Sequence, residues 1–177
     1  GALFAKEIDP DLIIVGEEIL TTRGELLVFF VQEEVPRGLT PAEAIERLKK
    51  QNAFISVSHP FDQLRHGWAM SDLQEITPYI DAIEIFNARS ISPSINQAAK
   101  EYAQENKLLG TVGSDAHLLV EVGKATQFVP AFTERDSLRI SLQRSETDEN
   151  YSSPLVRFGS TYAKIVKKIF GKNKFSL

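Results

Sequence analysis

The chain has 177 residues, of which 42% are hydrophobic, and a formal net charge of −4. This composition predicts one main domain with a substantial core, residues 1–150, and no overall attraction to nucleic acid or anionic membranes. Cysteine is absent, which excludes disulfides, thiolate metal sites and cysteine nucleophiles. No apolar run approaches the roughly 20 residues that span a bilayer, and no signal peptide is visible. We therefore expect a cytoplasmic protein without a membrane partner.

Charge is distributed unevenly along the chain. Residues 151–177 contain basic side chains and no acid, which defines a basic C-terminal extension. Residues 160–170 predict an amphipathic helix with apolar side chains on one face and lysines on the other. The lysines either contact nucleic-acid phosphates or form the solvated face of a helix that packs on the domain. They are Lys164, Lys167, Lys168, Lys172 and Lys174.

Predicted strands and helices alternate along residues 1–150. Short apolar runs indicate buried strands, and apolar residues at helical spacing indicate amphipathic helices. Thr40, Pro41 and Glu43 form a capping box at one helix start. The order predicts an α/β fold with a mostly parallel sheet, as a barrel or an open sheet. The predicted strands are 12–15, 19–22, 26–31, 54–57, 82–86, 108–112 and 125–129, with a hairpin at Arg23-Gly24; the predicted helices are 1–8, 41–48, 71–80 (capped by Ser71), 94–106 and 133–144, and 145–153 are loop.

A carboxylate and an imidazole follow the predicted strand 108–112. The sequence there is Gly113-Ser114-Asp115-Ala116-His117, and alternation in an extended backbone would point Asp115 and His117 the same way. Such a pair suits a divalent cation such as zinc, manganese or iron. Taken alone, a strand-end Asp and His more often cap a loop or bind the backbone.

Two earlier strand ends carry similar groups. Pro60 favours extended backbone at His59, which holds the imidazole at the end of strand 54–57. Glu17 and Glu18 are adjacent and must face opposite ways in an extended segment. We expect Glu18 to face the site and Glu17 to be surface charge.

In α/β folds, sites form where the carboxyl ends of strands meet, and the candidates all lie at such ends. Asn87 and Arg89 follow strand 82–86, and Arg65 lies in the loop after strand 54–57. Carboxylates and imidazoles together can hold cations, and the arginines can clamp an anion beside them. This combination favours metal-assisted hydrolysis.

Five short runs, taken in order, resemble the PHP family, the polymerase and histidinol phosphatase superfamily. They are GEE (16–18), SHP (58–60), DAIEIFNAR (81–89), GSDAH (113–117) and EVG (121–123). The resemblance implies a distorted (β/α)7 TIM-like barrel with two or three divalent metals (Zn, Mn or Fe) at its mouth. It implies metal-binding, catalytic roles for Glu18, His59, Asp115 and His117. It implies phosphate-facing roles for Arg65, Asn87 and Arg89.

The chain departs from the family pattern at its start. The family begins with a strand carrying His-x-His and a second strand ending in Asp-His, and neither is present here. Residues 1–3 resemble the helix that follows them. We therefore expect a fragment of a longer protein, a barrel that lacks its first strands. Open edges and exposed apolar surface predict either a homo-oligomer or a compact remnant.

The leading functional hypothesis is a metal-dependent phosphoesterase in the full-length protein. A metal-activated water would hydrolyse a phosphomonoester, a nucleotide or a nucleic-acid end. Because several histidine ligands are absent, we expect this chain alone to be weakly active or inactive. The alternative is a non-catalytic module derived from the same fold, which binds a nucleotide or a partner.

Overall fold

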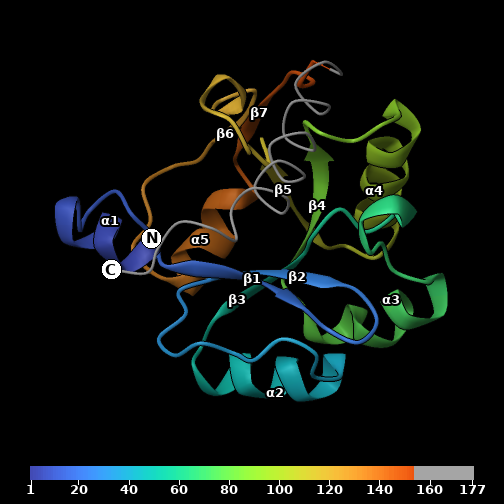
Figure 1. The fold of residues 1–177 in the computed structure, drawn as a ribbon, viewed down its shortest axis with the longest axis horizontal. Helices are drawn as coiled ribbons and strands as arrows, with labels where there is room; N and C mark the ends of the chain where they lie inside the picture. Colours follow the sequence, from blue (N-terminus) through green and yellow to red (C-terminus); the bar gives the residue numbers. More distant parts are fainter. Residues whose placement is uncertain (154–177) are drawn as a thin grey trace, which may run out of the picture.

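The computed structural model describes residues 1–153, so the predicted tail helix 160–170 and its lysines lie outside the described residues. The described chain forms a five-stranded sheet in the order β1-β2-β3-β4-β5 and a separate two-stranded sheet of β6 and β7 (Figure 1). In the first sheet β1 is Gly16–Leu20, β2 is Glu25–Phe29, β3 is Phe54–Val57, β4 is Ala82–Asn87 and β5 is Leu109–Gly113.

Strand directions change across the five-stranded sheet. β1 and β2 pair antiparallel with Leu20 opposite Glu25, which confirms the predicted hairpin. β2 also runs antiparallel to β3, whereas β3, β4 and β5 are parallel. The α/β class is therefore confirmed, but the sheet is mixed rather than mostly parallel. The sheet is also open, and no closed barrel is found in residues 1–153. Barrel closure requires a partner for each edge strand, and β1 and β5 are the edges here.

Helices cover both faces of this sheet. α2 (Pro41–Lys50), α3 (Met70–Ile76) and α4 (Pro93–Glu105) contribute to the main core, against apolar side chains of β1 to β4. α5 (Arg135–Leu142) packs on the other face in a smaller core with Phe54 and Ala82. Figure 1 shows α2 and α5 on opposite sides of the sheet. The predicted capping box of Thr40 and Glu43 is present at the start of α2.

The remaining helix, α1 (Ala2–Ile8), has no buried residue. No helix within residues 1–153 is long and apolar enough to cross a bilayer.

Several predicted elements differ from the structure, among them the strand 19–22, which is observed as Gly16–Leu20. Residues 12–15 are not a strand. A buried strand needs ladder partners on both sides. Among the described residues, this run is joined to the segment after β2 by a bond from the Val31 N–H to the Val15 carbonyl. α3 ends at Ile76 rather than at residue 80, since Pro78 opens a 3-10 turn there. The predicted loop after α5 contains β7 (Glu146–Glu149), which forms by pairing with β6 (Ala125–Phe128) despite its polar sequence.

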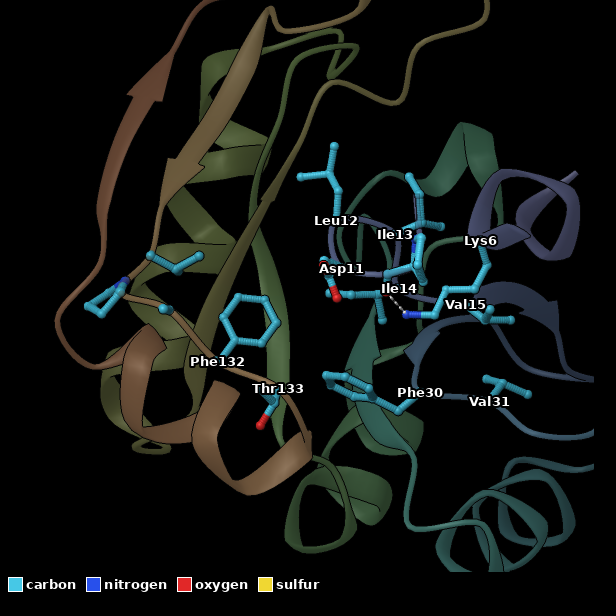
Figure 2. A pocket seen from close by; sticks show the side chains of 14 residues that line it. Lys6, Asp11, Leu12, Ile13, Ile14, Val15, Phe30, Val31, Phe132 and Thr133 are labelled. Atoms are coloured by element: carbon cyan, nitrogen blue, oxygen red, sulfur yellow. Dashed lines mark hydrogen bonds between the residues drawn. The ribbon is translucent and has the colours of Figure 1, made fainter. Parts of the chain in front are cut away.

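The apolar run 12–15 instead lines a cavity of about 690 Å³. Its far wall is the segment 129–133 that precedes α5. Figure 2 shows the rings of Phe30 and Phe132 approaching across it, with centroids 6.4 Å apart and an edge-to-face angle of 86°. Leu12 is largely exposed beside them. One side of the molecule therefore presents an open apolar surface.

Candidate metal centre

Three side chains converge on one point: Glu18 from the middle of β1, Glu25 from the start of β2 and His59 from just after β3. Nε2 of His59 lies 3.0 Å from Oε2 of Glu25 and 3.6 Å from Oε1 of Glu18. One ligand atom from each of the three residues lies within 4.8 Å of the others. Two carboxylates and one imidazole are a ligand set that zinc, manganese and iron accept. The donor set and its spacing therefore fit a divalent cation.

Strand alternation explains why Glu18 belongs to this group and Glu17 does not. Ile19 is buried in the main core, so Glu17 lies on the core side of β1 and Glu18 on the opposite side. Oε1 of Glu17 accepts the backbone N–H of Val35 at 2.9 Å. Oε1 of Glu18 accepts the hydroxyl of Ser58 at 2.9 Å, next to His59. The prediction that Glu18 faces the site agrees with this geometry, whereas the prediction that Glu17 is surface charge was wrong, because Glu17 lies on the core side and is half-buried.

Pairing of β2 with β3 brings Glu25 to the same place. Glu25 is the first residue of β2, and its carbonyl accepts the backbone N–H of Ser58 at 3.2 Å. Trp68 packs against Gly24, where a Cβ atom would lie 2.3 Å from the indole, and its Nε1 donates to the Glu25 carbonyl at 3.2 Å. The backbone of Glu25 is thus held from two sides.

The backbone of His59 is not extended, contrary to the sequence-based expectation. Its φ is +24°, a region that L-residues rarely adopt. The backbone N–H of His59 donates to Oε2 of Glu84 at 2.8 Å. This bond, together with the contact of Nε2 with Glu25, fixes the residue. Strained backbone held by its surroundings is common at functional sites.

Charge is strongly coupled within the group. Burial alone would lower the pKa of His59, but its bonds to Glu18 and Glu25 outweigh burial and raise that pKa to about 9. The same contact with His59 lowers the pKa of Glu18. The imidazole is therefore protonated at neutral pH and pairs with the two carboxylates.

Glu84 is a buried acid beneath this group, in the middle of β4. Burial raises its pKa to about 7. Its Oε2 also accepts the side-chain amide of Asn87 at 3.1 Å. Gly113 leaves space for the carboxylate, since a Cβ there would lie 2.7 Å from Oε1 of Glu84.

Asp115 lies beside Glu84 and outside the three-residue group. It accepts the amide of Asn87 at 3.3 Å and forms an ion pair with Arg65. Arg65 also donates to Asp62 at 2.8 Å and to Oδ1 of Asn87 at 3.3 Å. The structure thus brings the predicted phosphate-facing Arg65 and Asn87 into direct contact with the predicted ligand Asp115.

The alternation argument for Asp115 and His117 was wrong, because β5 ends at Gly113 and Asp115 has a φ of +47°. The two residues are nevertheless close: Nδ1 of His117 is 2.9 Å from the Asp115 carbonyl oxygen. His117 continues the Asp115 side of the network, and neither residue is among the three whose ligand atoms all lie within 4.8 Å of one another.

Arg89 lies behind this loop rather than at its surface. Its Nη1 donates to both carboxylate oxygens of Glu121 at 2.9 Å; Glu121 is buried, and the Arg89 side chain is 10% exposed. The role predicted for Arg89, contact with a phosphate, stays a prediction.

Three acids of the site were missed by sequence reasoning: Glu25, Glu84 and Glu121. Glu84 carried a usable signal, since it interrupts the apolar strand 82–86. Glu25 directly follows a turn, where acids are ordinary. Glu121 stands in the apolar run 118–122, which gave the same kind of signal as Glu84.

The model of a family described as PHP-associated (PHP_C) matches residues 93–147. The chain carries a PHP-associated region. Over these residues the match agrees with the PHP resemblance inferred from the motifs. The PHP-associated region runs from α4 to β7 and includes Asp115, His117 and Glu121, whereas Glu18, Glu25 and His59 lie before it.

Two curated relatives come from Methanocaldococcus jannaschii. The uncharacterized protein MJ0417 is 39% identical over 116 residues, which covers 63% of this chain and 49% of MJ0417. The uncharacterized protein MJ1587 is 31% identical over 104 residues, which covers 56% of this chain and 58% of MJ1587. The chain therefore spans about half the length of the curated relatives it matches.

A solved structure has a similar fold. PsfC from Pseudomonas syringae PB-5123 superposes with a TM-score of 0.62 at 22% identity, covering 85% of this chain and 64% of PsfC. The structural similarity extends well beyond residues 93–147, and at this identity it shows a shared fold alone.

Proposed function

We propose that Glu18, Glu25 and His59 bind a divalent metal, and that in the whole protein this centre serves hydrolysis of a phosphate ester. The observation that carries the proposal is the convergence of two carboxylates and one imidazole within 4.8 Å. The PHP relationship of the chain supports the same direction. A bound divalent cation would supply an activated water and neutralise phosphate charge.

The chain's own residues have defined tasks in this proposal. Glu18 and Glu25 provide negative charge, and His59 gives up its proton to bind through Nε2. Glu84 fixes His59 by accepting its backbone N–H at 2.8 Å. Arg65 stands next to Asp115 and is the guanidinium placed to contact a phosphate oxygen near the group.

One observation favours a second candidate, a non-catalytic module that binds a nucleotide or a partner. Asp115 is paired with Arg65, and it does not share the point where Glu18, Glu25 and His59 meet. A site with three ligands and a separate Asp115–Arg65 pair suits binding without turnover. Metal content alone does not separate the two candidates, whereas turnover does.

The decisive experiment compares two neighbouring acids. Calorimetric titration of the 177-residue chain with Mn²⁺ or Zn²⁺ should show stoichiometric binding, and Glu18→Gln should weaken it by about tenfold or more, as loss of a charged ligand does. Glu17→Gln is the matched control, because glutamine retains an oxygen that can accept the Val35 N–H. Equal affinity in both variants would contradict the metal site.

Turnover is tested on the same material. A generic phosphate ester is incubated with the metal-loaded chain, and released phosphate is measured for the unsubstituted protein and for His59→Asn. Phosphate release that His59→Asn abolishes supports the esterase. Stoichiometric metal with no release from the 177-residue chain or from a longer chain of the same protein favours the binding module.

A further inference from the structure

The turn that follows His117 has an inverted pattern of burial. Its apolar side chains face solvent: Leu119 is 91% exposed, Val122 is 67% exposed and Val120 is 65% exposed. Its charged residue, Glu121, is only 1% exposed. Burial of an acid and exposure of its apolar neighbours opposes the hydrophobic effect and requires a specific set of contacts.

Those contacts are present on Glu121. The carboxylate accepts the backbone N–H groups of His117 at 2.9 Å and Leu118 at 3.0 Å, and it pairs with Arg89. A charged group satisfied by a guanidinium and two N–H donors is strongly held. The turn is therefore fixed with Leu119 and Val120 outward, so its exposed surface is not the result of a loose loop.

This apolar turn borders the candidate site. Leu119 is two residues from His117, so their Cα atoms are within about 7 Å of each other. The loops that carry Arg65 and Arg89 present Leu64 and Ile91 to solvent in the same way. Contacts of Arg65 with Asp115 and of Arg89 with Glu121 join these loops to the turn's own loop. Exposed apolar side chains thus stand on three loops that these two ion pairs join.

We propose that the turn 118–122 binds the apolar organic group of the ligand, so that the site selects phosphate monoesters with an alkyl or aryl group over small polar ones. The inference rests on the proposed function for the position of the phosphate, at the metal and Arg65. A group attached to that phosphate is then within reach of Leu119 and Val120. An anionic membrane is a less suitable occupant, because the chain is acidic overall.

The test measures binding of phosphonates, which resist hydrolysis, so it needs no turnover. Methylphosphonate and hexylphosphonate are titrated in Mn²⁺ into the full 177-residue chain, into Leu119→Ser/Val120→Ser, and into Ile140→Ser. Ile140 is also exposed, at 58%, but lies on α5. Thermal unfolding of each variant verifies that the fold is retained.

The unsubstituted chain should bind hexylphosphonate about tenfold more tightly than methylphosphonate, since each buried methylene favours binding. Leu119→Ser/Val120→Ser should reduce this ratio to about two, and Ile140→Ser should leave it unchanged. A ratio near one in the unsubstituted chain, or one that the double variant does not alter, would overturn the proposal. So would binding of neither phosphonate.

Two further outcomes separate this inference from the proposed function. A chain-length preference lost in the double variant, without hydrolysis of any ester, supports the apolar contact and contradicts the esterase. Hydrolysis of methyl and hexyl phosphate at equal kcat/KM supports the esterase and overturns the apolar contact. The chain could instead sediment with anionic vesicles in a way that depends on Leu119 and Val120, while its affinities for hexylphosphonate and methylphosphonate are nearly equal. That result would assign the turn to a membrane and overturn the proposal.

Discussion

Glu17 and Glu18 are adjacent in β1 and have unlike surroundings. Glu17 accepts a backbone N–H on the core side, while Glu18 lies near a protonated imidazole on the other side. The strand's alternation predicts that the two acids face opposite ways, but the expectation that Glu17 is surface charge did not foresee its bond to Val35. Glu25 could not be found in the same way, since its neighbour His59 reaches it only through the pairing of β2 with β3.

The pKa of His59 makes metal affinity dependent on pH. Because that pKa is raised to about 9, the ring holds a proton at pH 7 that a metal must displace. Affinity for Zn²⁺ or Mn²⁺ should therefore rise by up to about tenfold per pH unit between roughly pH 6.5 and 9. Calorimetry in buffers of different ionisation enthalpy measures the proton release directly.

His59→Asn is the control for this pH dependence. Its residual metal binding should vary little over the same interval, because asparagine has no proton to lose. A slope that persists in His59→Asn would assign the titration to another group, with Glu84 the nearest buried acid whose pKa is raised.

Gly113→Ala should disturb the site through Glu84. The new methyl carbon would lie 2.7 Å from Oε1 of Glu84, so the carboxylate must move away from the His59 N–H and the Asn87 amide. We expect a loss of about 1–3 kcal/mol in the free energy of unfolding, as for other disturbed buried hydrogen bonds. Urea denaturation measures it.

The shorter acid in Glu84→Asp provides the test of mechanism. If the clash is the cause, Gly113→Ala should cost less in the Glu84→Asp background than in the unsubstituted chain, which a double-mutant cycle measures. Strictly additive losses would mean that the alanine acts on something other than Glu84.

Among the elements, the turn after β5 depends most on one side chain. Glu121→Ala removes the acceptor used by Arg89 and by two backbone N–H groups, so we expect a loss of about 3 kcal/mol in unfolding free energy. Glu121→Gln retains one acceptor oxygen and should cost less. Similar costs for both variants, measured by urea denaturation, would contradict the anchoring role.

Continuous apolar runs decide which strands are predictable. β3 and β4, which are buried along almost their whole length, were located within one residue of their observed bounds. β5 is only half-buried, and its apolar run located it equally well. β7 was missed, since pairing with β6 rather than composition makes Glu146–Glu149 a strand. The apolar run 12–15 predicted a strand for which the described residues provide no ladder.

At the scale of the whole molecule, the order of the elements predicted an α/β fold, as a barrel or an open sheet, and the family resemblance then favoured the barrel. Barrel closure is a long-range property that depends on partners for β1 and β5, and no local pattern encodes it. The convergence of strand ends was predictable because parallel strands place their carboxyl ends together, as β3, β4 and β5 do.

The open apolar side should produce self-association. Leu12 is exposed beside a cavity of about 690 Å³ whose walls are mostly apolar. We expect sedimentation velocity to show a mass that increases with protein concentration, and Leu12→Ser to reduce the increase more than Ile140→Ser does. A monodisperse monomer at high concentration would contradict this expectation.

The packing of Trp68 on Gly24 has a spectroscopic consequence. Trp68 is the chain's single tryptophan, and its indole is bonded to the backbone of Glu25. All tryptophan emission from the molecule therefore originates at one ring beside the candidate ligands. Quenching of the tryptophan fluorescence, or a shift in its emission wavelength, during a metal titration would report on Glu25 without any label.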